Sequence, residues 1–435
     1  MSEIEVVTFG CRLNAYESEV IRARATEAGL DKAVIVNTCA VTAEAVRQSR
    51  QAIRKLKRTH PDVEVIVTGC AAQIEPEMYA AMPEVDRVIG NEEKLSAKSY
   101  ARDFLKDAPR IMVNDIMAVK ETAGQLLDSF TDLSFGSRTR AVLQVQNGCD
   151  HRCTFCVIPY GRGPSRSVGA GVVVAEARRL VEAGFKEIVL SGVDLTAYGA
   201  DLPGRPTLGA LAAQILKHIP ELKRLRLSSI DSIEADDALI RMIAEEERLM
   251  PHLHLSVQAG DDLILKRMKR RHLRAHTIDF CNRIRRLRPE IAFGADLIAG
   301  FPTETNEMFE RTASLIDEAG FSYVHVFPFS VRKGTPAARM RQVPHATIKE
   351  RARVLRTKGQ AALSARLKRL IGSEQDILVE KAGIGRTPCF ATVAFEDSGF
   401  VAGDLVSVRI ADSDERNLHG RVLKMAANEA APAIA

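Results

Sequence analysis

Short apolar runs alternate with amphipathic stretches over the first hundred residues of the chain. Several of the apolar runs have no polar face, which is typical of strands covered on both sides. Strands are predicted at Ile4–Phe9, Ala33–Asn37, Val63–Thr68 and Arg87–Gly90, and helices at Ala15–Ala28, Ala43–Arg58 and Glu77–Ala81. This alternation predicts a small parallel sheet with helices on both of its faces.

A second strand–helix series follows a polar stretch, residues 106–138, which predicts a linker with one strand at Arg110–Val113. The strands of the series are expected at Arg140–Gln146, Glu187–Ser191, Arg224–Ser229, His252–Val257, Ala292–Ile298 and Tyr323–Phe329. The helices between them include Gly171–Ala183, Leu208–His218, Asp236–Glu247 and Ile278–Arg288. Six such units predict an incomplete parallel barrel, whose catalytic groups should lie at the carboxyl ends of its strands.

The pattern changes again after a long basic helix predicted from His345 to Leu370. Short alternating strands separated by Gly and Pro turns then predict a small β-barrel. These strands are expected at Gln375–Glu380, Cys389–Phe395, Leu405–Ile410 and Leu418–Met425. The chain is therefore expected to be of the α/β class, with three domains at residues 1–107, 135–366 and 370–426.

Composition places the chain among ordinary globular proteins, with 435 residues, 46% of them hydrophobic and 27% charged. No apolar run reaches 18 residues, so no membrane span is predicted, and the acidic start indicates no signal peptide. Eight cysteines are too few for a disulfide scaffold in a chain of this size and favour metal ligation in a reducing compartment. These features predict a cytoplasmic enzyme.

Positive charge is unevenly distributed, although the net charge is only +5. Between Lys266 and Arg288 ten Lys or Arg residues accompany one acid, Asp279, and the helix from His345 to Leu370 is also basic. Two interpretations stay open, namely solvated helix faces or a polyanionic partner, for which nucleic acid is the natural candidate. The segment from Ser373 onward holds ten acids and six Lys or Arg, so counterion release alone would not attract RNA to it.

Three cysteines lie within eight residues in the stretch Cys149-Asp-His-Arg-Cys153-Thr-Phe-Cys156. Three thiolates that converge in one loop favour iron or zinc. A structural zinc site or an electron-transfer cluster would need a fourth protein ligand, and the next cysteine is Cys281. The stretch resembles the three-cysteine loop of radical S-adenosylmethionine (SAM) enzymes, in which SAM occupies the open iron.

Three other cysteines each follow a predicted strand, in Phe9-Gly-Cys11, Asn37-Thr-Cys39 and Thr68-Gly-Cys70. The carboxyl ends of parallel strands share one edge of a sheet, where ligands bind. We therefore expect these thiols to converge and to form a second three-cysteine site. Cys281 and Cys389 fit neither pattern and are expected to be structural.

The stretch Thr8-Phe-Gly-Cys11-Arg-Leu-Asn14, with the Cys39 and Cys70 motifs, resembles the amino-terminal domain of the methylthiotransferases. The resemblance covers nearly the whole chain, and the final β-barrel resembles the TRAM domain, an RNA-binding module. Two positions depart from the family pattern, Ala259 where Ser is usual and Thr303 where Gly is usual. The resemblance implies two 4Fe-4S clusters, one held by Cys149, Cys153 and Cys156 and a second by Cys11, Cys39 and Cys70.

The resemblance also implies the chemistry and the SAM site. In this family a reduced cluster cleaves SAM to a radical that removes a hydrogen atom, the second cluster presents sulfur, and a second SAM supplies the methyl group. The glycines, polar groups and aromatic rings that would surround SAM are Phe155, Gly192, Asp194, Ser229, Gln258, Asp296 and Phe329. A simpler interpretation also stays open, with the glycines permitting turns and Ser229 capping a helix.

Family members differ in substrate. The residues in and around the cysteine motifs most resemble those of the type that acts on N6-threonylcarbamoyladenosine 37 in the anticodon loop of tRNA. Methylthiolation of isopentenyladenosine 37, or of an aspartate in a ribosomal protein, is the nearer alternative. An RNA-binding iron–sulfur protein without enzymatic activity is the more distant one. The expected partners are tRNA, an electron donor and a sulfur donor, with no membrane.

Overall fold

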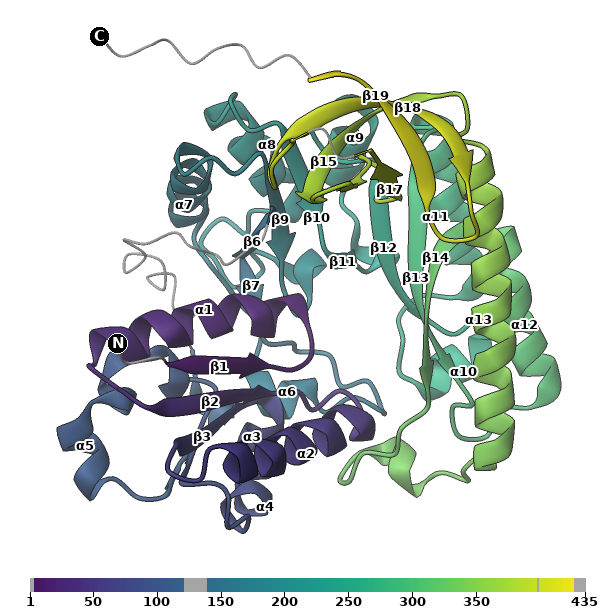
Figure 1. The fold of residues 1–435 in the computed structure, drawn as a ribbon. Helices are drawn as coiled ribbons and strands as arrows, with labels where there is room; N and C mark the ends of the chain where they lie inside the picture. The colour runs from purple at the N-terminus through teal and green to yellow at the C-terminus, as the bar shows by residue number, and fades with distance from the viewer. Residues whose placement is uncertain (1–3, 121–138, 397–398, 426–435) are drawn as a thin grey trace, which may run out of the picture.

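The computed structural model describes residues 4–120, 139–396 and 399–425 (Figure 1). Its first part is a parallel five-stranded sheet in the order β1-β2-β3-β4-β5. The strands are β1 (Glu5–Thr8), β2 (Ala33–Thr38), β3 (Glu64–Gly69), β4 (Arg87–Ile89) and β5 (Ile111–Met112). All five strands predicted for this region, including the short one in the linker, are confirmed.

Helices cover both faces of this sheet because alternate strand residues pack in opposite directions. Val36 packs in the same cluster as Ile53 of α2, whereas Ile35 packs with Ile21 of α1. The outer face of α1, through Tyr16, packs into the core of the next part of the chain. The helices are α1 (Arg12–Glu27), α2 (Ala43–Thr59), α3 (Cys70–Ile74), α4 (Pro76–Ala80) and α5 (Arg102–Asp107).

The second part is an incomplete barrel of parallel strands, as predicted. The predicted strand Arg224–Ser229 is divided in two, because residues 224–230 cross from one sheet to the next and change partners at Ser228. The first sheet has the order β10-β9-β6 and the second β11-β12-β13-β14. The strands are β6 (Ala141–Gln144), β9 (Glu187–Ser191), β10 (Arg224–Leu227), β11 (Ser229–Ile230), β12 (His252–Gln258), β13 (Ala292–Ala299) and β14 (Phe321–Pro328).

Helices cover the outside of the partial barrel, and the longest, α13, runs along β14 at its edge (Figure 1). Helix α11 begins four residues before the predicted start, because the Leu273 N–H donates to His276 Nδ1 and opens the helix at Arg274. No helix in the described part of the chain is long and apolar enough to cross a membrane. The helices are α7 (Ala170–Glu182), α8 (Leu208–His218), α9 (Asp237–Glu245), α10 (Asp262–Arg267), α11 (Arg274–Leu287), α12 (Asn306–Glu318) and α13 (His345–Lys368).

The inside of the partial barrel, called the lumen below, is polar. Leu253, Leu255 and Val257 of β12 pack into the apolar core with the surrounding helices, so the residues that alternate with them face inward. The same argument applies to each strand. The inward residues include Glu187 on β9, Arg224 and Arg226 on β10, His252, His254 and Gln258 on β12, Asp296 on β13, and Tyr323 and His325 on β14.

The third part is a closed five-stranded barrel in the order β15-β16-β17-β19-β18. The predicted strand at Cys389 begins later, because residues 387–391 form a turn in which Phe390 has φ 74°. The short strand β16, which contains Gly385, was not predicted from the sequence pattern. The strands are β15 (Glu374–Lys381), β16 (Ile384–Arg386), β17 (Thr392–Phe395), β18 (Leu405–Ser413) and β19 (Leu418–Met425).

The turn at residues 387–391 closes the amino end of the lumen. Arg226 donates to the carbonyl of Pro388 at 3.0 Å, and the hydroxyl of Tyr323 donates to that of Cys389 at 3.1 Å. The Phe390 ring stacks on His252 with 4.9 Å between ring centroids. The carboxyl end of the lumen therefore remains as the end at which a site can form.

Candidate active site

The three-cysteine loop is held at its base by a short antiparallel pair, β7 (Gln146–Asn147) with β8 (Arg166–Ser167). Gly148 has φ 73°, and a Cβ there would collide with the carbonyl of Pro164, so only glycine fits. A one-turn helix, α6 (Ile158–Arg162), follows the third cysteine. The predicted loop is thus held in place by the β7–β8 pair at its base and by α6 after its third cysteine.

The three thiols of this loop are partly buried and receive few charges that would ionise them. Burial raises the pKa of the Cys156 thiol to about 11, although the N–H of Ile158 donates to its Sγ at 3.4 Å. Arg270 lies 3.9 Å from Cys153 Sγ. Thiols of this kind lose their protons when a metal binds, so metal binding and ionisation are coupled here.

The spacing of the thiols fits a cluster better than a single ion. Four thiolates around one zinc lie roughly 3.8 Å apart, because each Zn–S bond is about 2.3 Å. Within the described residues, three ligand atoms lie within 4.8 Å of one another only at His254, Asp296 and His325 and at His151, Asp194 and Glu234. Neither set contains a thiol, so each group of three thiols has at least one pair of sulfur atoms more than 4.8 Å apart, which is wider than a zinc site.

Arg270 is an anchor that the sequence pattern did not assign. Its Nη2 donates to Asp231 and to the carbonyl of Ser256, both at 2.6 Å, which directs Nη1 toward Cys153. A cation beside a cluster ligand stabilises the charge of a reduced cluster. Its only signal in the sequence was the dense run of basic residues in which it lies.

His272, two residues beyond Arg270, gives the protein a defined response to acid. It is 1% exposed, and burial together with the charge of Arg270 lowers its pKa from 6.5 to about 4. Between these values the unfolded chain binds a proton that the folded protein does not. Folding stability should therefore fall by up to about 3 kcal/mol as pH drops from 6.5 to 4.

Thermal unfolding as a function of pH measures this effect, with His272→Gln beside an exposed control, His218→Gln. The glutamine amide can still donate to the carbonyl of Val257, which His272 meets at 3.1 Å. We expect the pH dependence over this window to shrink in His272→Gln alone. Equal slopes in both variants would show that His272 is not its source.

The second set of thiols lies at the carboxyl edge of the first sheet, where the strand argument expected it. Cys39 directly follows β2, Cys70 directly follows β3, and Cys11 caps the start of α1. A Cβ at Gly10 would lie 2.8 Å from Cys39 Sγ, and one at Gly69 would collide with the backbone of Thr38. Two glycines with positive φ therefore permit the three loops to meet.

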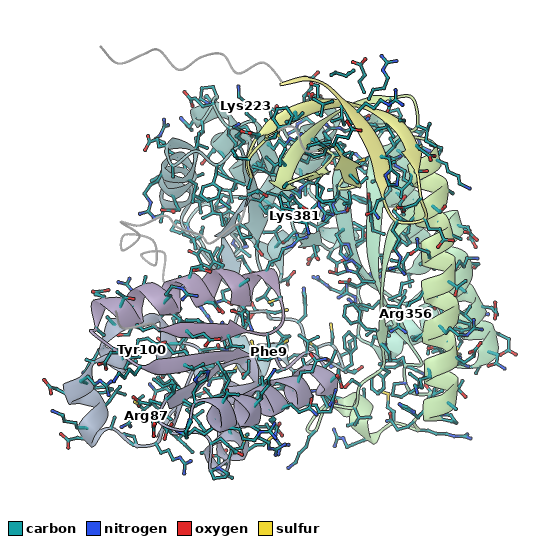
Figure 2. The ribbon with its side chains drawn as sticks, in the orientation of Figure 1. Phe9, Arg87, Tyr100, Lys223, Arg356 and Lys381 are labelled. Atoms are coloured by element: carbon teal, nitrogen blue, oxygen red, sulfur yellow. The ribbon has the colours of Figure 1, made fainter. Side chains whose placement is uncertain are left out.

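The two sets of thiols face each other across the junction of the first and second parts. A Cβ at Gly161, in the helix after the three-cysteine loop, would lie 3.2 Å from Cys70 Cβ. Asn91 donates to Cys70 Sγ at 3.6 Å and also bonds the carbonyl of Gly161. Phe9, labelled in Figure 2, marks the edge of the first sheet on this side.

A buried ionic network holds this junction together. Arg162 donates to both carboxylate oxygens of Glu17, at 2.8 and 2.9 Å, and Lys94 donates to the same carboxylate at 2.7 Å. All three side chains are at most 3% exposed. Burial raises the pKa of Glu17, but Arg162 and Lys94 outweigh it and lower the pKa to about 2.

The network leaves one positive charge in excess, because two cations share one carboxylate. Burial disfavours the charged form of Arg162, yet its pKa is raised by Cys70, Glu17 and Cys11. An excess cation next to three thiols favours their thiolate form and any anionic group that they hold. Burial nevertheless raises the pKa of the Cys39 thiol to about 12, so the loss of its proton would be coupled to metal binding.

Two groups of the expected SAM residues meet at the carboxyl ends of the strands. Phe155 packs edge-on against Phe301 at 6.3 Å, and Phe301 packs against Phe329 at 5.6 Å, which makes an aromatic wall. On the other side, Asp194 donates its backbone N–H to the side chain of Gln146 at 2.8 Å, and Gly192 lies against the same side chain.

Asp194 contacts the cysteine loop as well. Its carboxylate lies 3.6 Å from Cys149 Sγ and 3.0 Å from His151 Nε2. Hydrogen bonds to Asp194 and Glu234 raise the pKa of His151 to about 10. Neither Gln146 nor His151 was singled out from the sequence, since a polar side chain in a loop carries no periodic signal.

The remaining expected SAM residues are more dispersed. Gln258 is the last residue of β12, and Ser229 is the second-last residue of the divided strand 224–230, so each lies near the carboxyl end of its strand. Asp296 does not, because it lies three residues before the end of β13, and its expected place at a strand end is wrong. It is inside the lumen, 2.8 Å from His254 and 3.3 Å from His325.

Comparison with known proteins gives this geometry a context. Residues 143–316 match the radical SAM superfamily, and residues 3–90 match the family described as uncharacterized protein family UPF0004. The chain is 57% identical over 392 residues to the threonylcarbamoyladenosine tRNA methylthiotransferase MtaB of Rickettsia prowazekii, with 90% of this chain and 91% of that one covered. The chain belongs to the methylthiotransferase family of radical SAM enzymes. It is therefore a transferase.

Other members of the methylthiotransferase family carry different names. The Bacillus subtilis MtaB is 34% identical over 99% of this chain and 98% of its own. A tRNA-2-methylthio-N(6)-dimethylallyladenosine synthase of Erythrobacter litoralis is also 34% identical, over 97% of each chain. Among solved structures, the radical SAM methyltransferase TsrM of Kitasatospora setae matches with a TM-score of 0.56 and 16% identity, over 77% of this chain and 75% of that one, which shows the fold.

Membership of the radical SAM group implies SAM and a 4Fe-4S cluster as cofactors, and the loop of Cys149, Cys153 and Cys156 fits that cluster. The three thiols leave one iron of a four-iron cluster without a protein ligand. The aromatic wall and the Gln146 side chain flank the loop on two sides. These residues are the ones that would hold SAM against the cluster.

Much of the basic charge of this methylthiotransferase turns out to be structural. In the segment from Lys266 to Arg288, Arg274 pairs with Glu318, and Arg288 donates to three backbone carbonyls at the end of α9. In α13, Lys358 pairs with Asp317 at 2.6 Å. The solvated-face interpretation is therefore incomplete for these residues, since several hold the core helices in place.

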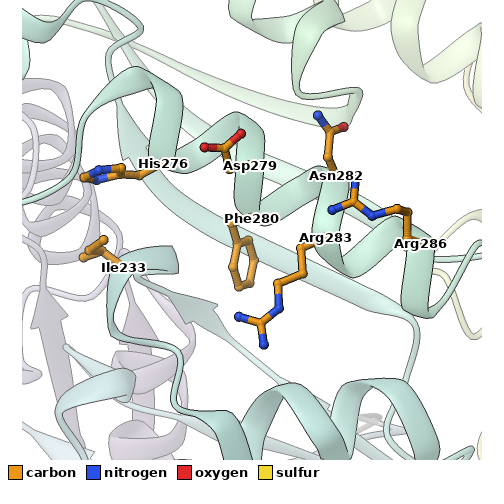
Figure 3. Close-up of a pocket in the computed structure, with 7 residues that line it drawn as sticks. All are labelled: Ile233, His276, Asp279, Phe280, Asn282, Arg283 and Arg286. Carbon is orange, nitrogen blue, oxygen red and sulfur yellow. The ribbon is translucent and has the colours of Figure 1, made fainter.

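A cavity of about 450 Å³ opens beside α11 on the outside of the core (Figure 3). It is lined by Ile233, His276, Asp279, Phe280, Asn282, Arg283 and Arg286. None of these residues belongs to either thiol set or to the lumen, so this cavity is separate from the candidate active site of the family.

Proposed function

We propose that this protein methylthiolates C2 of N6-threonylcarbamoyladenosine 37 in the anticodon loop of tRNA, with one SAM for the radical and a second for the methyl group. The name of the 57%-identical relative supports this choice of substrate. Family members named for the dimethylallyl substrate are less similar, at 34–36% identity. The cofactors proposed are SAM and two 4Fe-4S clusters, the second held by Cys11, Cys39 and Cys70.

The observation that carries the proposal is the facing of the two thiol sets across one junction. A reaction that removes hydrogen from a carbon and then adds sulfur to it requires both functions within reach of the same atom. The contacts of Gly161 and Asn91 with Cys70 bring the two loops together. A single-cluster enzyme would have no need of this arrangement.

When bound, the cluster and SAM supply the radical that no side chain can provide. The residues of the chain bind, orient and exclude water. The aromatic wall of Phe155, Phe301 and Phe329 provides an apolar surface, and Arg162 fixes the distance between the two parts. A groove of about 800 Å³ along β14 and α13 includes Arg356, labelled in Figure 2, and Arg416, and supports an approach for RNA.

The same proposal assigns roles to the three parts of the chain, with residues 1–107 holding the second cluster, 135–366 forming the radical SAM core, and 370–426 forming a TRAM-like module. Residues 1–3, 121–138, 397–398 and 426 lie outside the described residues, so the boundaries at residues 1, 135 and 426 do too. A cytoplasmic location, an electron donor and a sulfur donor remain predictions from the sequence.

Deletion of the gene should remove the 2-methylthio group from threonylcarbamoyladenosine in tRNA and leave the unmethylthiolated nucleoside to accumulate. Liquid chromatography with mass spectrometry of digested tRNA measures both nucleosides. Restoration by the wild-type gene, but not by a Cys70→Ala gene, ties the loss to the second thiol set. We expect the methylthio form to become undetectable.

Other outcomes would replace the proposal. Loss of the methylthio form of isopentenyladenosine instead would assign the neighbouring substrate. Unchanged tRNA with an unmethylthiolated ribosomal protein would assign a protein substrate. If neither changes and the reconstituted protein does not cleave SAM, an RNA-binding iron–sulfur protein is the better description.

A further inference from the structure

Four guanidinium groups surround one aromatic ring where the three parts of the chain meet. The carbon atoms of these groups lie between 4.5 and 5.7 Å from the centre of the Phe390 ring. They come from different parts of the fold, namely Arg12 from α1, Arg140 and Arg226 from the partial barrel, and Arg386 from the carboxy-terminal barrel. We call these four residues the arginine cluster.

Three members of the arginine cluster have carboxylate partners. Arg226 bonds Glu187 at 2.7 Å, and Arg386 bonds Glu380 at 2.9 Å. Arg140 pairs with Glu380 and lies 3.8 Å from Glu187. Two carboxylates thus serve three guanidinium groups of the cluster, and Arg224 shares one of them at 3.6 Å. The cluster has more positive charge than its own acids can balance.

Arg12 is the member without a carboxylate. Within the described residues it makes no hydrogen bond or ion pair, and its side chain is exposed. The guanidinium groups of Arg140 and Arg226 lie around the same Phe390 ring, 5.6 and 4.9 Å from its centre. Positive charge therefore surrounds an exposed guanidinium that has no carboxylate partner, and such a place attracts an anion.

Two buried polar atoms beside Arg12 also lack partners. His252, which is 5% exposed, stacks on Phe390, and its Nδ1 has no hydrogen-bond partner in the described structure. The Nη1 of Arg140 is likewise buried without an acceptor. Unpaired buried polar atoms are rare in folded proteins. In a binding site, a ligand can supply the missing hydrogen-bond partner. The guanidinium nitrogen of Arg140 is a donor, so it calls for a ligand that carries oxygen atoms.

The position of Arg12 in the sequence restricts what this ligand is. Arg12 directly follows Cys11, so their Cα atoms are about 3.8 Å apart. In a purine, C2 and the carbon that bears N6 both flank N1, on the same edge of the base. A base that presents C2 to the Cys11 thiol edge therefore carries its N6 substituent close to Arg12.

We propose that Arg12 is the specificity residue that binds the carboxylate of the threonylcarbamoyl substituent. The inference rests on the proposed function and names the residue that reads the group distinguishing this substrate. The planar guanidinium matches a carboxylate with two parallel hydrogen bonds. An apolar substituent at N6 would leave Arg12 desolvated and unpaired, which disfavours that substrate.

Binding of synthetic anticodon stem–loops by the reconstituted protein tests this role without relying on turnover. One RNA carries N6-threonylcarbamoyladenosine at position 37 and its match carries plain adenosine. For Arg12→Gln we expect affinity for the first RNA to fall about 10- to 100-fold, the range for a lost charge-assisted pair, with affinity for the second unchanged. Arg12→Lys, which retains a point charge, should lie between.

Arg22→Gln is the matched control, because it removes one positive charge from the same helix ten residues away, or about 15 Å along its axis. Its side chain is exposed and lies 3.6 Å from Glu19. We expect neither RNA to be affected. Equal melting temperatures and iron contents of the variants would establish that they fold alike.

The other results separate the inference from the proposed function. If Arg12→Gln weakens both RNAs equally, Arg12 contacts a phosphate, and its assignment to the carboxylate is overturned. If the wild-type protein prefers the modified RNA and Arg12→Gln keeps that preference, the inference fails while the proposed substrate stands. If the wild type does not prefer the modified RNA, the proposed substrate falls and the inference with it.

Discussion

Replacing Cys149, Cys153 and Cys156 together with alanine is expected to lower the iron content of the anaerobically reconstituted protein from about eight to about four atoms per chain. Each thiol set would hold one four-iron cluster, and these three thiols would be the ligands of the one that faces the proposed SAM site. The same variant should lose reductive cleavage of SAM entirely. Iron and sulfide analysis, with chromatographic detection of 5′-deoxyadenosine, measures both effects.

The reciprocal variant, with Cys11, Cys39 and Cys70 replaced, should also retain about four irons but keep the cleavage of SAM. Cys281→Ala is the control, because Cys281 is buried in the apolar core of the partial barrel, outside both thiol sets. It should retain both clusters. If wild-type iron is about four and falls to none in the first variant, the second thiol set holds no cluster, and a single-cluster radical enzyme replaces the proposal.

The thiol sets could be predicted from the sequence because their signals are local. Three cysteines in eight residues define a loop by themselves, and one cysteine after each of three predicted parallel strands defines an edge of a sheet. The glycines that allow the loops to approach, Gly10 and Gly69, stand immediately before Cys11 and Cys70. The confirmed order of the first sheet follows from the same run of buried strands.

The parts of the site that escaped prediction depend on residues far apart in sequence. Arg162 and Glu17 are 145 residues apart, and Arg12 meets Phe390 only because a turn of the last barrel enters the lumen. The sequence pattern around a polar residue on a buried strand does not show whether its side chain pairs with another side chain or contacts a ligand. For this reason the sequence could not show that Asp296 lies between two histidines, His254 and His325.

The division of one predicted strand into β10 and β11 has a related cause. Residues 224–230 pair with β9 in their first half and with β12 in their second half. The change of partner follows from the curvature of an open barrel, which depends on all of its strands together. Apolar patterning finds such a strand but does not reveal that it belongs to two sheets.

Glu17→Gln is expected to weaken the junction between the first and second parts by about 3–5 kcal/mol, the cost of breaking a buried ion pair. The substitution preserves shape but leaves Arg162 and Lys94 buried without a carboxylate. Because both thiol sets approach each other through this junction, it should also reduce methylthiolation more than cleavage of SAM. Native-state hydrogen exchange of the amides in α1 and α6 measures the local opening free energy directly.

Glu27→Gln is the matched control for this variant, since Glu27 lies on the same helix in an exposed pair with Arg24 at 2.8 Å. Such a pair contributes about 0–1 kcal/mol, and its loss should leave the junction unchanged. Adding Lys94→Met to Glu17→Gln removes one of the two unpaired cations and should recover part of the lost protection. If Glu17→Gln opens the junction no more than Glu27→Gln does, apolar packing of α1 holds the two parts together instead. Arg162 would then contribute only positive charge near Cys70.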